Sequence, residues 1–370
     1  MKGLVMNYRT ILLFLLIYFL YTCGFSAEIH TASKKIERTF KVSPATTVDI
    51  TNKYGKIHII HWSKDSARFE INVTARSDEK DKLKKLLDNV SFDFTGTQYY
   101  VTAKTIIGTN RSNFLDDLKQ IRESIVSSES GVKIDYTVML PNYVNLKIDN
   151  RYGDVYADDI KGSFNLNLTN GDFNINSISG DTKMDVKFGN GDINTINNGH
   201  LTIAYGELEI KKAEQLDINS KSSKINIGKI HVLKIQSRRD KYYIDNIDFL
   251  YGETYFSDVW PYLLNKEISF NMKYGNLNMK SINKTFSFIN INSQFTDLNL
   301  YFQKGSSYEI DITHKNNMLN FPEEISNLQK QALESDSKQF LTHGTIGKSK
   351  PTAKVRIKGE GSNIYIKLIE

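Results

Sequence analysis

The sequence predicts an all-β fold, organised as a single-stranded parallel β-solenoid (β-helix) of about ten rungs with two helical insertions. Three observations predict it: groups of four residues that alternate polar and apolar, an apolar residue at a fixed distance before each group, and nearly even spacing between groups. Two-residue alternation is typical of a strand with one buried face. One such repeat cannot bury its own apolar face, whereas a stack of repeats can.

Each group begins with a polar residue and has an apolar residue in second place. The groups begin at Lys56, Asp154, Asp172, Asp192, Glu207, Lys224, Asn276, Asp297 and Asn363. The residues six positions before each start are all apolar: Ile50, Ile148, Leu166, Val186, Leu201, Ile218, Phe270, Ile291 and Ile357. We expect these side chains to form one buried column through the stack.

A turn precedes each group. Two positions before the start the residue is mostly Tyr or Asn, often followed by Gly: Tyr54, Tyr152, Asn170, Asn190, Tyr205, Ser222, Tyr274 and Phe295. Asn-Gly pairs adopt positive φ angles at little cost, so they mark tight turns. From Asp154 to Lys224 the groups follow one another at nearly even steps, and a weaker copy begins one further step along, at Lys241. Steps this even predict coils that stack directly on one another.

Two segments interrupt the array. Apolar residues recur at helical spacing over 78–90 and 113–126, and again over 322–334. We expect these helices to cover open strand edges, with a partner-binding helix as the alternative. The predicted organisation is therefore a signal peptide (1–27), an N-terminal β segment (28–147) with a helical insertion at about 78–126, solenoid repeats (148–315), a helix and polar loop (316–350) and closing strands (351–370).

The N-terminus is typical of a signal peptide. Lys2 and Arg9 precede an apolar run over 11–20, and small residues up to Ala27 favour cleavage. The run is short for a membrane span, so we expect export, to the periplasm or cell surface, with no transmembrane segment after signal removal. Cys23, the one cysteine, leaves a lipid anchor as the less favoured alternative, because bulky Tyr21 precedes it where small residues are preferred.

The composition and charge of the chain limit the kinds of partner that it is expected to bind. Hydrophobic residues make up 40% of the chain and aromatic residues 11%, enough for a substantial core. The net charge is +6, and removal of a leader that carries Lys2 and Arg9 leaves 46 basic and 42 acidic residues, or +4. This mild, well-mixed charge predicts no nucleic-acid partner, which would require clustered Lys and Arg.

Residues 50–59 (ITNKYGKIHI), residues 150–155 (NRYGDV) and the later Asn-Gly-Asp repeats resemble the bacterial putative-adhesin family. The resemblance runs from about Phe40 to the C-terminus. It implies an exported, right-handed β-solenoid of adhesin-like character and unknown function, with no catalytic residues to transfer. The motif is structural, so it is more specific for fold than for activity.

The outward third position of the groups is the candidate binding face. Its asparagines are Asn174, Asn194, Asn226, Asn278 and Asn299. A row of uncharged donors and acceptors suits glycan or peptidoglycan strands, although stacked asparagines can equally bond to one another along the stack. The tyrosines before glycine, such as Tyr54 and Tyr152, present the same choice between a sugar platform and a stacked ladder.

The sequence contains few residues in the patterns that metal sites or catalytic sites require. Four groups begin with an acid, and these acids suggest a column of calcium ligands: Asp154, Asp172, Asp192 and Glu207. Lys224 and Lys241 interrupt this column. His58 and His61 point to opposite faces of a strand, so they are not expected to share a metal. We expect no metal site, no cofactor and no catalytic residues, with the adjacent Asp158 and Asp159 as the nearest enzyme-like pair.

The predicted function is that of a non-enzymatic, exported, adhesin-like envelope or surface protein with a structural or interaction role. Its expected partner is a cell-wall or surface glycan, or another envelope protein. The alternative is a periplasmic scaffold or sensor component of an envelope-stress system. A polysaccharide lyase or hydrolase on a β-helix comes third, and a cleft of acidic, basic and aromatic side chains on neighbouring rungs would favour it.

Overall fold

The computed structural model describes residues 29–108, 131–322, 326–333 and 338–369. In these residues strands predominate, and the helix assigned there is α2 (Lys80–Asp88). The strands are β1 (His30–Lys41), β2 (Thr47–Lys53), β3 (Ile57–His61), β4 (Ser66–Ser77), β5 (Val90–Gly96), β6 (Tyr100–Ile107), β7 (Gly131–Leu140), β8 (Asn145–Arg151), β9 (Val155–Ile160), β10 (Phe164–Thr169), β11 (Phe173–Ile178), β12 (Thr182–Lys187), β13 (Gly191–Ala204), β14 (Glu207–Lys221), β15 (Lys224–Arg238), β16 (Lys241–Ile282), β17 (Phe288–Gln303), β18 (Tyr308–Lys315), β19 (Met318–Asn320), β20 (Ser326–Ala332), β21 (Gln339–Ile346), β22 (Ala353–Glu360) and β23 (Asn363–Ile369).

The all-β class is confirmed, but a single parallel β-solenoid with two helical insertions is wrong. The described strands form one mixed sheet of 23 strands. Near the C-terminus β18 pairs antiparallel with β21, and β21 pairs antiparallel with β20. The antiparallel strands β20 and β21 thus occupy the segment where the sequence predicted a helix and a polar loop (316–350), and β22 and β23 then pair in parallel with β17.

The helix predicted over 322–334 is wrong, because β20 occupies most of this segment. Leu328 lies opposite Gly344 in the antiparallel pair with β21. Helix propensity and apolar spacing are weak signals over a segment of three to four turns, and backbone pairing with a neighbouring strand overrides them. In the first insertion α2 lies within the predicted helical segment and buries Leu83, while the segment 113–126 lies outside the described residues.

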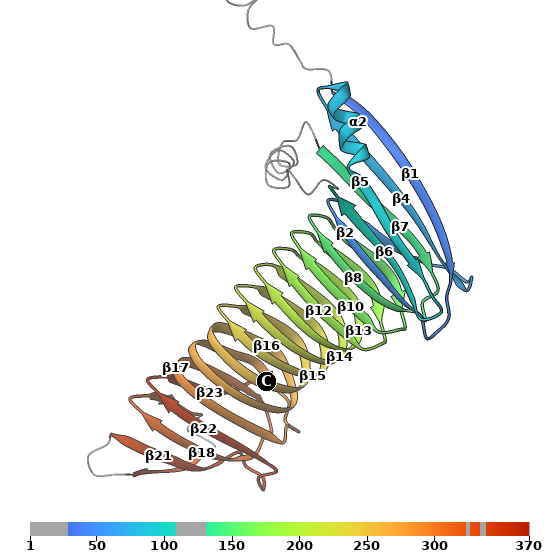
Figure 1. Ribbon diagram of the computed structural model, residues 1–370. Helices are drawn as coiled ribbons and strands as arrows, with labels where there is room; N and C mark the ends of the chain where they lie inside the picture. The colour runs from blue at the N-terminus through green and yellow to red at the C-terminus, as the bar shows by residue number, and fades with distance from the viewer. Residues whose placement is uncertain (1–28, 109–130, 323–325, 334–337, 370) are drawn as a thin grey trace, which may run out of the picture. The chain divides into compact units, whose positions relative to one another are not determined.

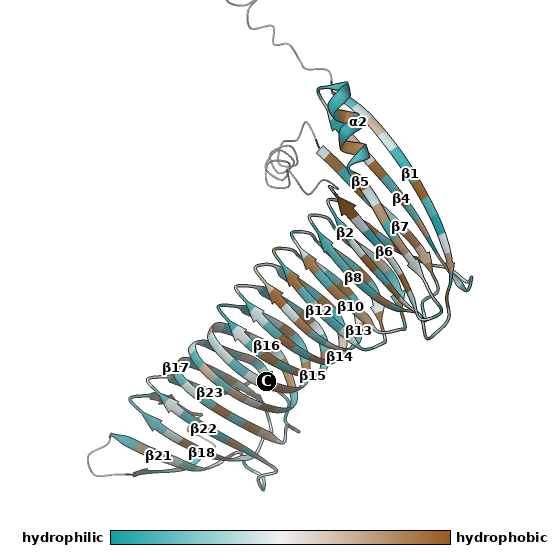
Figure 2. Ribbon diagram, viewed as in Figure 1, coloured by the Kyte–Doolittle hydropathy of each residue, from teal (hydrophilic) through white to brown (hydrophobic). Residues whose placement is uncertain are grey.

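The repeats themselves pair in parallel (Figure 1), with register partners such as Leu166 and Met184, and then Met184 and Leu201, in successive strands. β10 lies between β8 and β12, so that Leu166 has Ile148 on one side and Met184 on the other. The inward column continues through the next strands as Leu201, Ile218 and Ile235. Every residue of the predicted column in 148–235 is buried, but Val186 lies beside Leu168 rather than Leu166. Brown and teal bands along the strands in Figure 2 follow this alternation.

The displaced Val186 has a local cause. The turn before β13 is formed by Phe188, with φ of 57°, and Gly189, not by Asn190 and Gly191. Gly191 already belongs to β13, where a Cβ atom would lie 2.0 Å from the ring of Phe173. This glycine therefore makes room for a buried aromatic side chain on the previous repeat, and the true group starts two residues earlier than predicted.

A column of residues with positive φ runs along the turns, one from each repeat. It consists of Tyr54, Tyr152, Asn170, Phe188, Tyr205, Ser222, Arg239, Phe256, Tyr274 and Phe295. Glycine follows the first five of these residues because the turns stack closely: a Cβ at Gly153 would lie 2.0 Å from the carbonyl oxygen of Gly55. We call this set the turn column.

The chain divides into two compact units. The smaller comprises 1–34, 73–90 and 107–132, and its described part includes α2 with Asp81 in the first turn and Lys85 in the last. Those charges complement the helix dipole. The larger unit comprises 35–72, 91–106 and 133–370 and contains the repeats and the groove described below.

Candidate functional site

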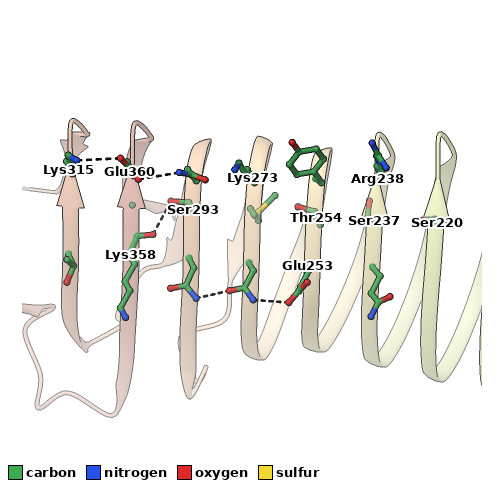
Figure 3. A pocket seen from close by; sticks show the side chains of 18 of the residues that line it. Ser220, Ser237, Arg238, Glu253, Thr254, Lys273, Ser293, Lys315, Lys358 and Glu360 are labelled. Carbon is green, nitrogen blue, oxygen red and sulfur yellow. Dashed lines mark hydrogen bonds and ion pairs between the residues drawn. The ribbon is translucent and has the colours of Figure 1, made fainter.

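A hollow of about 980 Å³ lies on one face of the larger unit, across successive repeats from β14 to β18 and β22 (Figure 3). The strand segment that precedes each turn forms it, and side chains that alternate outward along these segments line it. We call this hollow the groove. Its residues form two rows, each with one member per repeat.

The floor row is polar throughout. Its members occupy matching register positions: Asn219, Gln236, Glu253, Asn271, Asn292 and Lys358. Asn292 Nδ2 donates to Asn271 Oδ1 at 2.7 Å, and Asn271 Nδ2 donates to Glu253 Oε1 at 3.3 Å. Side chains joined in this way hold fixed orientations and keep further donor and acceptor positions for a ligand.

The rim row lies beside the turns and carries most of the charge. Its members in the groove are Arg238, Tyr255, Lys273, Gln294, Glu360 and Lys315. Glu360 binds Lys315 at 3.7 Å and accepts a hydrogen bond from Gln294 at 3.3 Å. In the described part of the chain, the side chains of Arg238, Lys273 and Lys358 have no carboxylate partner. The groove therefore offers cations to a ligand.

A buried polar cluster supports the groove wall from beneath. Asp240, 2% exposed, accepts hydrogen bonds at 2.7 Å from the hydroxyls of Ser220 and Ser237. Its carboxylate also accepts from the backbone N–H groups of Ser223 at 2.8 Å and Arg238 at 2.9 Å. Burial raises the pKa of the Asp240 carboxyl, although these hydrogen bonds act in the opposite direction. The cluster fixes the turn that carries Arg238.

Four of the five predicted asparagines share one outward column, on the strand segment that follows each turn. Asn278 lies beside Asn299. Acids and aromatic side chains separate the other two asparagines of the column. The order in register is Tyr156, Asn174, Asp192, Glu209, Asn226 and Tyr243. This column is not a continuous amide row.

Asn194 is not part of that column. Its Nδ2 donates to Asn176 Oδ1 at 2.9 Å, so Asn194 belongs to an outward row two residues further along the strand than Asn174. The cause is the two-residue displacement of the turn at Phe188 described above. A small hollow of about 160 Å³ adjoins Asn174 and Asn194, and Asp192 and Glu209 also line it.

Of the four acids that suggested a calcium column, Asp154 and Asp172 accept hydrogen bonds from backbone N–H groups, and Glu207 pairs with Lys224 at 3.2 Å. Asp154 accepts a hydrogen bond from the N–H of Asp172 at 3.0 Å. After Asp154 and Asp172, the third member of this column is Asn190 rather than Asp192. The side-chain oxygen of Asn190 accepts a hydrogen bond from the N–H of Glu207 at 2.9 Å. Among the described residues, no group of three or more His, Cys, Asp or Glu side chains is placed to hold a metal ion.

Asp158 and Asp159 also serve local contacts. Ser177 and Asn176 donate to Asp159 at 2.6 and 2.7 Å, and these bonds lower the pKa of its carboxyl. Asp158 accepts from the backbone N–H of His61 at 3.1 Å. Within the described structure this pair has no adjoining cleft of catalytic size, since the hollow beside it holds only about 10 Å³.

Sequence reasoning missed the floor row, although a signal was present. Its residues directly follow members of the inward column, as Asn219 follows Ile218 and Asn271 follows Phe270. The predicted binding residues lie on the strand after each turn, whereas the floor row lies on the strand before it. Both strands alternate, so both have an outward row, and only the three-dimensional curvature distinguishes the hollow face from the others.

The fold and the groove together define an all-β repeat protein with an elongated polar hollow on one face. No family model matches the chain, and no curated protein matches it. Within the described residues, no helix is long and apolar enough to cross a membrane.

Solved structures do match. One is described as a putative adhesin from Parabacteroides distasonis, with 12% identity, coverage of 73% of this chain and 97% of that one, and a TM-score of 0.34. Another is a putative cell adhesion protein from Clostridium sporogenes, with 10% identity, coverage of 91% and 100%, and a TM-score of 0.17. A third is a putative lipid binding protein from Parabacteroides distasonis, with 12% identity, coverage of 70% and 96%, and a TM-score of 0.32. The descriptions of these structures as a putative adhesin and a putative cell adhesion protein agree with the resemblance expected from the sequence.

Proposed function

We propose that this is an exported, non-enzymatic, adhesin-like protein of the bacterial envelope or surface, which binds an extended polysaccharide along the groove. The hydrogen-bonded floor row carries the proposal. A polysaccharide presents hydroxyl groups at repeated intervals, and a row of amide and carboxylate side chains offers donors and acceptors at the strand spacing of about 4.8 Å. Tyr255 supplies an exposed aromatic side chain beside this row.

The test is binding of the purified protein to an array of bacterial capsule and cell-wall polysaccharides that includes peptidoglycan sacculi. The groove variant Asn271→Ala with Asn292→Ala should lower affinity at least tenfold for each glycan that the wild type binds. The matched control is Asn165→Ala with Asn198→Ala, two exposed asparagines outside the groove, and it should leave affinity within twofold. Absence of wild-type binding to the whole array, or equal loss in both variants, would refute groove binding.

Location is a separate part of the proposal. Protease treatment of intact cells should degrade a surface protein and spare a periplasmic one. A protein that is protected until the outer envelope is opened would instead favour a periplasmic scaffold or sensor.

Cleavage of the bound polysaccharide is a second candidate function, because one observation favours it. The groove brings acidic, basic and aromatic side chains onto one face of neighbouring repeats, namely Glu253, Lys273 and Tyr255. Chain-length analysis of a bound polysaccharide after prolonged incubation tests this function. Shortened chains with the wild type, and intact chains with Glu253→Gln, would establish an enzyme; intact chains with both leave a binding protein.

A further inference from the structure

The rim row continues beyond the groove toward the N-terminal repeats. Residue by residue in register, the continuation from the groove outward is Lys221, Ala204, Lys187, Thr169, Arg151 and Lys53. From Lys53 to Gln294 this row contains no acidic residue. The row from Lys53 to Gln294 is here called the basic edge.

Like charges are direct neighbours on the basic edge. Lys53 pairs in register with Arg151, and Lys221 pairs in register with Arg238. Cross-strand pairs of like charge destabilise a sheet, so this arrangement opposes folding. Arg151 and Lys187 have carboxylates two residues away on their own strands, at 3.8 and 3.2 Å. In the described structure Lys53, Lys221, Arg238 and Lys273 have no such partner.

The turn column lies next to the basic edge in sequence and presents exposed aromatic rings. Phe188 and Tyr205 stack with centroids 4.9 Å apart, and Phe256, Tyr274 and Phe295 form a second stack at 4.7 and 5.4 Å. Phe188 is 54% exposed and Phe295 49%. Exposed phenylalanines in a row are unusual on a surface that contacts only water.

Cations of the basic edge lie over these rings. The ammonium groups of Lys53, Lys221 and Lys273 lie 4.5, 5.3 and 5.4 Å from the ring centroids of Tyr54, Tyr205 and Tyr274. Contact with a ring restrains a long side chain while its charge stays available to a ligand. The edge is therefore a linear series of restrained cations beside apolar ring edges.

We infer that the groove's ligand is a linear polyanion, an acidic polysaccharide whose carboxylates bind along the basic edge while its sugar faces contact the aromatic turn column. This inference rests on the function proposed above and names its ligand class. The cations of this single line lie one or two strand spacings apart, about 4.8 or 9.6 Å, which matches a chain with repeated charges. The basic edge continues into the groove at Arg238 and Lys273 (Figure 3).

Polygalacturonate and its fully methyl-esterified form are the test probes, since they share a backbone and differ in charge. Wild-type protein should bind polygalacturonate at least tenfold more tightly than the ester, and this preference should disappear at high salt. The edge variant combines Lys53→Gln and Lys221→Gln with Arg239→Gln in the adjacent turn column, all outside the lining of the groove. It should lose at least tenfold in affinity for polygalacturonate at an unchanged melting temperature.

The control variant combines Lys183→Gln, Lys241→Gln and Lys280→Gln, exposed lysines on other rows that change the net charge equally. It should lose less than twofold. Equal loss in the two variants would reduce the effect to net charge and overturn the inference. Equal binding of the two polymers would overturn it too, and would leave groove binding of glycans intact.

Two further outcomes separate the proposals. Loss of polygalacturonate binding in the edge variant but not in Asn271→Ala with Asn292→Ala would place the ligand on the edge alone and refute the groove. Binding to vesicles of phosphatidylglycerol, with no retention on polygalacturonate, would overturn the polysaccharide in favour of a membrane surface.

Discussion

The carboxylate of Asp172 accepts a hydrogen bond from the backbone N–H of Asn190, with 2.7 Å between Oδ1 and nitrogen. Asp172 and Asn190 occupy the same position in successive repeats. The same bond recurs one repeat earlier and one repeat later, from Asp172 to Asp154 and from Glu207 to Asn190. Side chains thus bridge repeats at a place where the tight turns leave backbone donors without strand partners.

Asp172→Ala should therefore lower the free energy of unfolding by about 1 kcal/mol, the usual net contribution of an intramolecular hydrogen bond, because this side chain is exposed. Asp181→Ala is the control, since that side chain is exposed and has no partner among the described residues. Chemical denaturation of both variants measures the difference. Equal stabilities would mean that the bridge contributes nothing beyond solvation.

Gly171→Ala should destabilise the repeats much more. A Cβ at this position would lie 2.2 Å from the carbonyl oxygen of Gly153, and backbone on both sides prevents an easy shift. We expect a loss of about 3 kcal/mol or more. Gly305→Ala is the comparison, because its positive φ of 88° carries strain but no atom lies within 4 Å, so about 1 kcal/mol is expected. Thermal melts that rank these two variants in reverse would contradict the packing account.

Asp240→Asn should cost about 3 kcal/mol, because the amide cannot accept all four hydrogen bonds and its NH₂ group opposes a donor. The pH dependence has a defined sign. Burial raises the folded-state pKa of Asp240 above its ordinary 3.8, so the folded protein binds this proton more tightly than the unfolded chain. The contribution of Asp240 to stability should fall as the pH rises from about 3.8 through the folded-state pKa.

Subtracting the unfolding free energy of Asp240→Asn from that of the wild type, pH by pH, isolates this effect from the other carboxyls. A difference that grows as the pH rises through that range would contradict the assigned direction.

His314 should make the C-terminal strands sensitive to mild acid. Burial, and then the charge of Lys330, lower its pKa from 6.5. Its Nε2 contacts Thr342 Oγ1 at 3.0 Å, and its ring stacks on Phe340. Because the unfolded chain binds this proton more tightly, stability should be lost as the pH falls from about 6.5 toward the folded-state pKa. NMR titration of the His314 ring and denaturation between pH 7.5 and 5 measure the effect.

Two variants test its origin. His314→Gln should remove this part of the pH dependence, and Lys330→Gln should raise the His314 pKa and weaken it. An unchanged His314 pKa in Lys330→Gln would leave burial as the sole cause.

The repeat could be predicted from the sequence because each strand has one buried face, and alternation records which face it is. Ile148, Leu166 and Leu201 were placed correctly for that reason. The error at Val186 arose because Phe188-Gly189 and Asn190-Gly191 both look like turns. The spacing itself contained the answer, because a start at Asn190 instead of Asp192 makes the steps between neighbouring groups almost equal.

Other features depended on contacts between distant residues. The direction of β20 is set by its pairing with β21, a later strand of the chain, and apolar spacing within the segment does not report it. The groove likewise depends on how the strands before the turns curve. The polar character of Asn219 or Asn271 was readable from the sequence, but the hollow over them was not.

The bonds between repeats run along the direction in which the repeats stack, and this has a mechanical consequence. Tension applied along the stack loads those bonds one strand at a time, so the repeats should peel off in sequence instead of shearing together. Each released repeat, such as the stretch from Leu166 to its register partner Met184, adds about 60 Å of extended chain. Stepwise release of repeats would therefore dissipate mechanical work while the remaining repeats stay folded.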